Sequence, residues 1–557
     1  MMSSPATTWS RAFWGALIAR GVSDVVVSPG SRSQALALSA LEWEHTGHLR
    51  VHVVIDEASA AFRALGIGLE SAIPAVCIAT SGSAPAHFMP AVMEAHHAGV
   101  PLVVVSADRP PEGLGVGANQ TTAQSGLFGF AAPTFDAVAE DEGAEKSALD
   151  VAAAAWNQAI VGAPAHVNVA FREPLSSSEA GDLRLRAVGE EPEKPHRGET
   201  LSLVAEPGTL VIAGHQAGER AEKLAYELGA PLIAEVTSGA RFGPHLLVAY
   251  REVLAAKELP GPLSRIITVG RPTLSREVWG IVSDDSLSHI VLRGPEREPA
   301  NPTHQAHLVD AIEVSQPATH QQRSEWVKPW VMASRQHHES ALFAALPTPP
   351  DTGVGEADDP ATRSAFAQQE MRVLRRTVTR AELALSLWEA SWPHDRLVLG
   401  ASRMIREMDK IVGPKNIPVF ANRGLSGIDG TIATARGIAL SAGGSGASGV
   451  TRVLLGDLAF LHDVGSLMSE PGIEDTSSVH LFIANDGGGT IFDGLEVSHS
   501  AAPESRDRVL YTPQNVDIEA LAGAYGWDYR AVTTMGELAD ALVARDSKVI
   551  VDIALER

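Results

Sequence analysis

The sequence contains a single cysteine, Cys77, among its 557 residues. One cysteine cannot form an intramolecular disulfide or a cysteine-cluster metal site, and its scarcity fits a reducing compartment such as the cytoplasm. Positive charge is also scarce, because 44 Lys and Arg face 67 Asp and Glu and leave a net charge of −23. Nucleic acids and anionic membranes bind basic surfaces, so this balance argues against either as the main partner.

The sequence also lacks a long hydrophobic run. The uncharged stretch 151–171 is interrupted by amide side chains, Pro164 and His166, which makes it a poor membrane span. The N-terminus has no basic region followed by a long apolar core, so it predicts no signal peptide. We therefore expect a soluble, cytoplasmic protein with no membrane insertion and no nucleic-acid partner.

What is present is a regular alternation of helical and strand-like segments. Segments 56–70 and 89–98 have helical spacing and lie between short apolar runs at 25–27, 51–55, 75–78 and 102–105. Near-continuous apolar strands separated by helices predict a parallel sheet covered on both faces. The fold class is therefore α/β.

The chain is too long for one core, and at roughly 100–200 residues per domain it predicts about three or four domains. Two Pro-rich, charged stretches, 173–200 and 347–360, are typical of linkers. They predict three α/β domains, over residues 1–180, 200–346 and 370–557. The first and third pieces are alike in outline, which suggests an internal repeat with a ligand held between the two.

The most specific chemical signal lies in the third piece. Asp457 follows the predicted strand 453–455, and Asp486 follows the predicted strand 479–483 and precedes three glycines. The carboxyl ends of neighbouring parallel strands form the edge where such folds bind ligands, and magnesium prefers carboxylate and phosphate oxygens. The alternative is a pair of Asx turns at strand ends, which composition alone favours.

This spacing resembles the magnesium-diphosphate motif of thiamine-diphosphate enzymes. That family has a pyrimidine-binding, a middle (transhydrogenase-like) and a diphosphate-binding domain of this size and order, so the resemblance covers the full chain. It implies three doubly wound parallel-sheet domains of the pyruvate-decarboxylase-like architecture, a thiamine diphosphate cofactor, and magnesium or manganese held by Asp457, Asp486 and the carbonyl of Gly488. Asp486, beside Asn485, replaces the family's usual second Asn, and Leu458 replaces the last residue of its Gly-Asp-Gly.

The same resemblance implies a catalytic glutamate from the first domain that protonates a ring nitrogen of the cofactor's aminopyrimidine. Glu57 matches it, just after the predicted strand 51–55. A buried glutamate beside an apolar ring has the raised proton affinity that acid–base work requires. The alternative is a helix-start carboxylate that interacts with the helix dipole.

Longer segments are similar to one subfamily, the carboligases of menaquinone biosynthesis that join 2-oxoglutarate to isochorismate. They are SPGSRSQAL (28–36), IDEASAAFRALGIG (55–68), TSGSAPAHFMPAVMEAHHAGVPLVVVSADRPPE (80–112), GANQ (117–120), ANRGLSGIDGTIATARG (421–437) and GDLAFLHD (456–463). The similarity implies a transferase that decarboxylates 2-oxoglutarate and adds the succinyl-semialdehyde carbanion to isochorismate.

Two dianionic substrates require arginines, whose planar fork pairs with carboxylates. Four arginines lie beyond predicted strands within these motifs: Arg32, Arg109, Arg406 and Arg423. A lone arginine at such a place is more often solvated. The resemblance adds further substrate contacts at Ser31, Asn119, Gln120, Arg276, Phe492 and Leu495, and further cofactor contacts at Ser402, Ile428 and Ile491. The apolar members of this set can also serve as ordinary core, and Ser275 stands where the family often has Lys.

The resemblance also implies a homo-oligomer, a dimer or tetramer, with the cofactor between the first domain of one subunit and the third domain of another. Two alternatives remain open. One is another thiamine-diphosphate decarboxylase or carboligase acting on a pyruvate-like 2-oxo acid. The other is a catalytically silent relative that acts as a binding or scaffold protein, against which the retention of Glu57, Asp457 and Asp486 argues.

Overall fold

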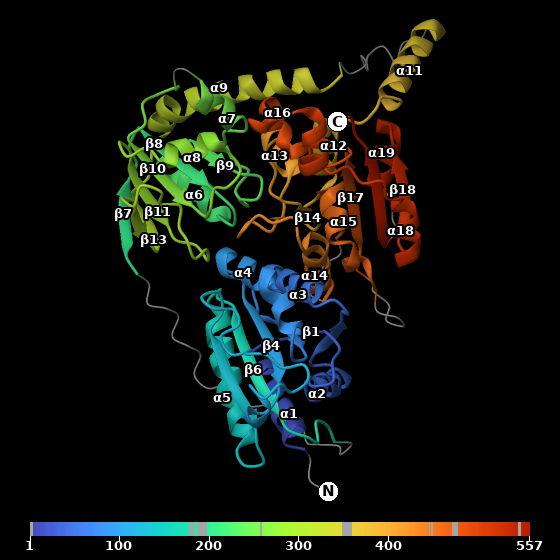
Figure 1. Cartoon of the computed structure of the whole chain (residues 1–557). Coiled ribbons are helices and arrows are strands. Elements are labelled where there is room, and N and C mark those ends of the chain that lie inside the picture. The colour runs from blue at the N-terminus through green and yellow to red at the C-terminus, as the bar shows by residue number, and fades with distance from the viewer. Residues whose placement is uncertain are drawn as a thin grey trace.

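The computed structural model describes residues 4–177, 183–185, 198–256, 259–347, 359–444, 446, 449–469, 477–543 and 547–557. Figure 1 shows three lobes: the first domain at the bottom, the middle domain at the upper left and the third domain at the upper right. Parts of both predicted linkers, at 178–182, 186–197 and 348–358, lie outside the described residues. Within the described part of the chain, no helix is long and apolar enough to cross a membrane.

The first domain is a six-stranded parallel sheet in the order β2-β1-β3-β4-β6-β5. Its central strands are buried along their whole length because helices cover both faces. The strands are β1 (Asp24–Val27), β2 (Arg50–Val53), β3 (Ala75–Ala79), β4 (Leu102–Asp108), β5 (Thr134–Ala139) and β6 (Ala165–Phe171). The helices are α1 (Pro5–Ile18), α2 (Gln34–His45), α3 (Glu57–Ser71), α4 (Met89–Ala98) and α5 (Ala144–Ile160), with 3₁₀ turns η1 (Ala84–Phe88) and η2 (Pro111–Gly113).

The middle domain has a five-stranded parallel sheet in the order β12-β11-β10-β8-β9 and a separate parallel pair, β13-β7. The strands are β7 (Thr200–Val204), β8 (Thr209–Ala213), β9 (Leu232–Ala234), β10 (Arg265–Val269), β11 (Ser288–Leu292), β12 (His307–Val309) and β13 (Ala311–Gln316). The helices are α6 (Glu219–Leu228), α7 (Tyr250–Ala255), α8 (Arg276–Val282) and α9 (His320–Ala345). The last turns of α9 pack on the core of the third domain through Ala341, Leu342 and Ala345, so this helix bridges the two domains (Figure 1).

The third domain is again a six-stranded parallel sheet, in the order β15-β14-β16-β17-β19-β18. The strands are β14 (Arg396–Leu399), β15 (Val419–Phe420), β16 (Thr451–Gly456), β17 (Val479–Asn485), β18 (Asp528–Val532) and β19 (Lys548–Ala554). The α-helices are α11 (Pro360–Leu374), α12 (Arg380–Ala390), α13 (Arg403–Ile411), α14 (Thr431–Gly444), α15 (Asp457–His462), α16 (Val497–Ser500), α17 (Pro503–Arg506), α18 (Ile518–Tyr525) and α19 (Met535–Leu542). Shorter helical turns are η3 (Val464–Leu467), η4 (Thr490–Gly494) and η5 (Asp507–Tyr511).

The first and third sheets have the same topology. If the strands are counted from the start of each domain, both sheets run second, first, third, fourth, sixth, fifth, and all neighbours are parallel. This confirms the internal repeat at the level of strand order. It also makes β3 equivalent to β16 and β4 equivalent to β17.

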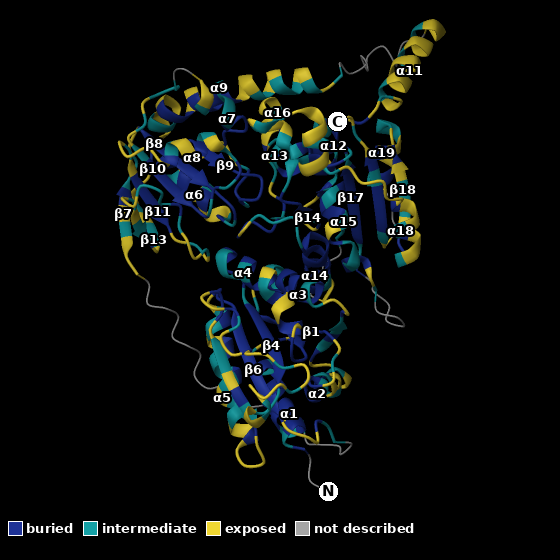
Figure 2. Ribbon diagram, viewed as in Figure 1, coloured by how far each residue is buried: buried dark blue, intermediate teal, exposed yellow. Residues whose placement is uncertain are grey.

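The first and third domains pack against each other along α3 and α14. Gly66 and Gly437 allow this contact, because a Cβ at Gly66 would overlap the carbonyl of Thr434 and one at Gly437 would overlap the carbonyl of Arg63. The two backbones therefore run in direct contact. Figure 2 shows that the central strands of the three sheets and most of α3 and α14 are buried, whereas the outer helices α9 and α11 are largely exposed.

The middle and third domains are joined by a buried polar cluster around Asp409 of α13, which is fully buried. Its carboxylate accepts hydrogen bonds from the backbone N–H of Val236 at 2.8 Å, the Tyr250 hydroxyl at 2.5 Å and the Arg251 guanidinium at 2.6 Å. Each donor comes from the middle domain. Because a buried carboxylate needs all of these partners, the cluster fixes how the two domains meet.

Candidate active site

Asp457 and Asp486 lie side by side at the carboxyl edge of the third sheet. Asp457 follows β16 and begins α15, Asp486 follows β17, and the ends of the two strands pair through Gly456 and Ala484. Both side chains are buried. Burial raises the pKa of Asp457 and the neighbouring charge of Asp486 raises it further, while hydrogen bonds from the backbone of Leu458 and Gly488 lower it. The two carboxylates are therefore close enough to repel each other.

One oxygen of Asp486 is held by two neighbours and the other is not. Its Oδ2 accepts hydrogen bonds from Arg380 Nη2 at 2.7 Å, Arg380 Nε at 3.2 Å and Thr490 Oγ1 at 2.6 Å. Oδ1 has no hydrogen-bond donor among the described residues. The neighbouring Asn485 instead donates to Asp552 of β19 at 3.0 Å, so it is Asp486 that lies toward Asp457.

Gly488 occupies a position that only glycine can fill. Its φ is +127°, a region that side chains rarely adopt, and an added Cβ would overlap the carbonyl oxygen of Tyr511. Its own carbonyl accepts the N–H of Thr490 at 2.9 Å. Two mutually repelling carboxylates, one with a free oxygen, and the backbone carbonyl of Gly488 beside them make a set of hard oxygen donors, which fits magnesium or manganese.

Glu57 is the first residue of α3, at the carboxyl end of β2. The N-terminus of α3 is capped by Asp56, which accepts the N–H of Ser59 at 2.7 Å, so Glu57 is not needed for that role. The Glu57 side chain is half-buried and makes no hydrogen bond or ion pair with the described residues. It lies near Cys77, whose pKa is raised by burial and, to a smaller extent, by the charge of Glu57. Its carboxylate is thus available to a ligand.

The predicted polar contacts of the first domain gather at the carboxyl ends of β3 and β4. Arg109 Nη2 donates to the carbonyl of Asn119 at 3.0 Å. Gln120, with a φ of +57°, donates from Nε2 to the carbonyl of Ser81 at 3.0 Å, and the Ser81 hydroxyl donates back to the Gln120 carbonyl at 3.0 Å. Asn119 and Gln120 are exposed. The Gln120 side chain therefore ties this loop to the sheet edge, whereas Asn119 meets solvent.

Arg32 lies beside this group at the end of β1. Its backbone N–H donates to Thr80 Oγ1 at 3.2 Å, and its guanidinium donates to the carbonyl of Phe171 at 3.1 Å. Glu173 is 3.9 Å from the guanidinium, which is almost fully buried. Ser31, the preceding residue, is exposed. The end of β1 thus contributes one anchored cation and one free hydroxyl.

The half-buried Arg406 and the buried Arg423 form a cationic group where the third domain meets the middle domain. Arg406 donates to the carbonyl of Ser402 at 2.7 Å, and burial lowers its pKa, as does the nearby Arg251. Arg423 is only 2% exposed. Burial lowers its pKa to about 10, so it remains charged at neutral pH. The position suits a ligand with a negative charge.

The other predicted substrate and cofactor contacts are less buried than Arg423. Arg276, at the start of α8, is exposed and forms an ion pair of 3.7 Å with Glu496 of the third domain. Ser275 caps α8 by accepting the N–H of Val278 at 3.2 Å. Four half-buried apolar side chains complete the set: Ile428, which packs on the third core, Ile491 and Phe492 in η4, and Leu495 just after it.

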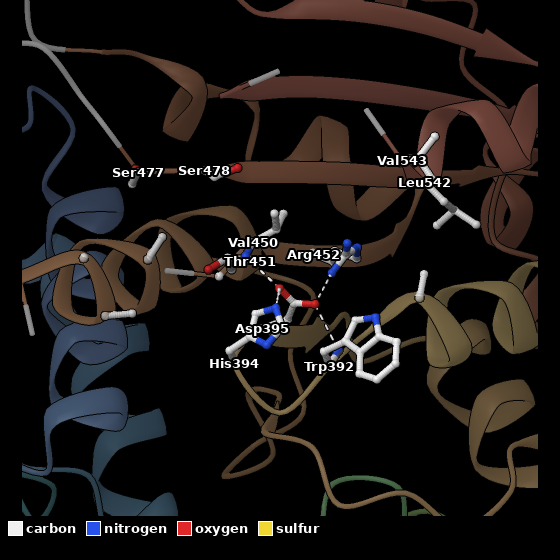
Figure 3. Close-up of a pocket in the computed structure, with 15 residues that line it drawn as sticks. Trp392, His394, Asp395, Val450, Thr451, Arg452, Ser477, Ser478, Leu542 and Val543 are labelled. Atoms are coloured by element: carbon white, nitrogen blue, oxygen red, sulfur yellow. Dashed lines mark hydrogen bonds and ion pairs between the residues drawn. The ribbon is translucent and has the colours of Figure 1, made fainter. Parts of the chain in front are cut away.

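A cavity of about 570 Å³ lies at the opposite edge of the third sheet, at the amino end of β16 (Figure 3). The carboxylate in its lining is bonded to other lining residues. Asp395 accepts hydrogen bonds from Arg452 at 2.7 Å and from the backbone N–H groups of Trp392 and Val450, both at 2.9 Å. Asp457 and Asp486 are at the other end of the strands. This cavity is therefore separate from the candidate site.

Sequence reasoning missed Arg380 and Thr273, which hold the site residues Asp486 and Arg423. Arg380 is 106 positions from Asp486, and Thr273 is 150 positions from Arg423 and in another domain. Neither residue belongs to a local sequence pattern that could predict a contact with a residue so far away in the chain. Thr490 directly follows the glycines after Asp486, so its contact with Asp486 could have been predicted from that motif.

Comparison with known proteins identifies the class first. A solved structure of benzoylformate decarboxylase from Polynucleobacter necessarius matches with a TM-score of 0.63 and 15% identity, over 100% of this chain and 99% of that chain. Residues 7–127 match the family described as thiamine pyrophosphate enzyme, N-terminal TPP binding domain. The fold is thus the predicted three-domain architecture of the thiamine pyrophosphate (thiamine diphosphate) enzymes.

Relatives that match over the full chain then identify one family within this class. The 2-succinyl-5-enolpyruvyl-6-hydroxy-3-cyclohexene-1-carboxylate synthase of Leifsonia xyli subsp. xyli is 47% identical over 100% of this chain and 97% of its own length. The synthase of the same name from Clavibacter michiganensis subsp. michiganensis is 45% identical with the same coverage, and that of Paenarthrobacter aurescens is 38% identical over 97% of this chain and 92% of its own length. The chain belongs to this synthase family.

Proposed function

We propose that this protein is a 2-succinyl-5-enolpyruvyl-6-hydroxy-3-cyclohexene-1-carboxylate synthase. It decarboxylates 2-oxoglutarate with thiamine diphosphate and adds the remaining four-carbon unit to isochorismate, in menaquinone biosynthesis. The observation that carries this proposal is the identity of 47% with a synthase of that name over 100% of the chain. The cytoplasmic location inferred from the single cysteine stays a prediction.

The residues at the carboxyl edge of the third sheet would hold the cofactor through its diphosphate. Asp457, Asp486 and the carbonyl of Gly488 would supply oxygen ligands for magnesium or manganese, whose charge would offset that of the diphosphate. When bound, thiamine diphosphate supplies a carbon nucleophile and accepts the electron pair left by departing carbon dioxide. Glu57 would hold a proton at the aminopyrimidine ring, and Ile428, Ile491 and Ser402 would contact the cofactor.

The arginines would bind the substrate carboxylates. Arg32 and Arg109, with Ser31, Asn119 and Gln120, come from the first domain. Arg406 and Arg423 come from the third domain, and Arg276 from the middle domain. The net charge of −23 repels dianions, so these cations must dominate within about 8 Å, the screening length at physiological salt. Phe492 and Leu495 would keep water from the reacting carbon, where early protonation would divert the reaction.

The active site would form between two copies of the chain. Glu57 belongs to the first domain and Asp457 and Asp486 to the third, and among the described residues of one chain no hydrogen bond or ion pair joins Glu57 to either aspartate. A homo-oligomer, dimer or tetramer, that sets the first domain of one subunit against the third domain of its partner would bring them together.

The test is consumption of 2-oxoglutarate by the purified protein with thiamine diphosphate and magnesium, with and without isochorismate. We expect consumption to accelerate strongly with isochorismate and the coupled adduct to form. Cofactor binding with turnover of a pyruvate-like acid but no adduct would favour a different decarboxylase of this class. Absence of thiamine diphosphate binding would favour a catalytically silent relative.

A further inference from the structure

The segment that carries Arg423 is held by both of the other domains. Glu94 of α4, in the first domain, accepts the N–H of Gly424 at 2.6 Å and the N–H of Leu425 at 2.7 Å, one with each carboxylate oxygen. Arg271 of the middle domain donates to the carbonyl of Gly424 at 2.8 Å. Segment 423–425 therefore lies at the junction of all three domains.

The close approach of α4 leaves no room at Gly424. A Cβ there would stand 2.6 Å from the carbonyl oxygen of Glu94 and 3.0 Å from the backbone nitrogen of Ala98. Glu94 itself is only 4% exposed, and burial raises its pKa while the two N–H donors lower it. A buried carboxylate that receives two short hydrogen bonds from consecutive residues fixes the backbone of the segment.

The guanidinium of Arg423 is fixed as well. Its Nε donates to Thr273 Oγ1 at 3.0 Å, and its Nη2 donates to the Thr273 carbonyl at 3.1 Å. Thr273 is braced in turn, because Glu235 accepts the N–H groups of Thr273 and Leu274 at 2.8 and 2.7 Å. Arg423 Nη1 is buried and has no hydrogen-bond partner among the described residues.

These contacts determine the direction of the one free donor. A guanidinium is planar, so two hydrogen bonds to one residue set the orientation of the third nitrogen. A charged donor left without a partner in a buried position is costly unless a ligand satisfies it. Arg423 thus has one nitrogen, Nη1, ready for an anion and two nitrogens committed to the middle domain.

We propose that Glu94, Arg271 and Thr273 are positioning residues that hold Arg423 so that its Nη1 receives a carboxylate of one substrate. The proposal rests on the proposed function for the identity of that substrate. It makes the middle domain part of the substrate site, because Thr273 aligns a guanidinium that belongs to the third domain. Of these four residues only Arg423 contacts the substrate, and the other three act through it.

The first test uses Thr273→Val, which keeps the shape of the side chain and removes the hydroxyl that Arg423 Nε contacts. Arg423→Lys first identifies which substrate, 2-oxoglutarate or isochorismate, depends on the guanidinium. We expect Thr273→Val to raise KM for that same substrate about tenfold, the effect of losing one charge-assisted hydrogen bond, with kcat within about threefold. Thr273→Ser, which keeps the hydroxyl, should restore KM.

The second test compares two glutamates of the first domain. Glu94→Gln removes one of the acceptors that hold segment 423–425. Glu70→Gln is the matched control, because Glu70 also binds the third domain, through Arg396 at 2.5 Å, without touching that segment. Glu94→Gln should raise KM for the Arg423-dependent substrate, and Glu70→Gln should leave both KM values unchanged at equal thermal stability.

The proposal is overturned if Thr273→Val leaves both KM values unaltered, or if Glu94→Gln and Glu70→Gln change them alike. A measurement that does not depend on turnover distinguishes failure of this proposal from failure of the proposed function. Phenylglyoxal modification of Arg423, followed by mass spectrometry, should be faster in Glu94→Gln and Thr273→Val than in Glu70→Gln. If the unaltered protein turns over neither substrate, the proposed function fails while this comparison still tests whether Arg423 is held.

Discussion

Glu235 provides a test of how burial controls charge at the boundary between the middle and third domains. The side chain is fully buried, and burial, followed by the charge of Asp409, raises its pKa from 4.5 to about 8. Oε1 accepts two backbone N–H groups, whereas Oε2 has no partner in the described part of the chain. At neutral pH we therefore expect a protonated carboxylic acid, which Glu235→Gln imitates in shape.

The sign and size of the effect follow from proton linkage. Between pH 4.5 and 8 the folded protein keeps a proton at Glu235 that the unfolded chain has lost, so the free energy of unfolding falls as pH rises and levels off above pH 8. With one proton and about 1.4 kcal/mol per pH unit, the loss from pH 6 to pH 8 is about 2 kcal/mol. The amide introduced by Glu235→Gln does not titrate, so the variant avoids this loss.

The assay is urea denaturation of both proteins across this pH range, comparing the same tryptophan-fluorescence transition. The stability of Glu235→Gln relative to the unaltered protein should increase by about 2 kcal/mol between pH 6 and pH 8. Glu227→Gln, which removes a partly exposed carboxylate of α6, is the control for a general charge effect. Parallel curves for Glu235→Gln and the unaltered protein, or a difference that shrinks as pH rises, would refute the reasoning.

Three further predictions concern the proposed cofactor site. Asp457→Asn removes one charge from the proposed metal site and should weaken magnesium-dependent binding of thiamine diphosphate, measured by calorimetry, at least tenfold. Unchanged affinity would exclude Asp457 as a ligand. Gly488→Ala places a Cβ against the Tyr511 carbonyl at a φ of +127°, so it should abolish cofactor binding while circular dichroism stays native, and wild-type affinity would contradict the geometry. If sites form between subunits, inactive Glu57→Gln and Asp457→Asn chains that are unfolded and reassembled together should recover roughly a quarter of full activity. Half of the dimers are then mixed, and each mixed dimer has one intact site out of two. No recovery would place the site within one chain.

The sheets could be predicted from the sequence because their strands are buried on both faces. Segments such as 25–27 and 102–105 are β-branched and apolar without interruption, and the structure places β1 and β4 there. Helices α9 and α11 were not predicted, for the opposite reason. Helix α11 has no buried residue, so its sequence carries no apolar stripe, and α9 contains Pro329 within a largely polar segment.

The candidate site likewise contains residues that the sequence predicts and residues that it does not. Asp457 and Asp486 could be predicted because residues at the ends of neighbouring parallel strands meet at one edge. Arg380 and Thr273 could not, since each is brought to the site by the packing of elements far apart in the chain. Local pattern thus predicts the groups that would face a ligand, whereas the groups that hold them depend on how domains and helices pack.

The shared strand order of the first and third sheets has a consequence for how the two have diverged. Position for position, Thr80 after β3 corresponds to Asp457 after β16, and Arg109 after β4 corresponds to Asp486 after β17. At the latter position one copy carries a cation and the other an anion. Two sheets of the same topology therefore present opposite charges at matching edges, so that the first edge is suited to anions and the third-domain edge to cations.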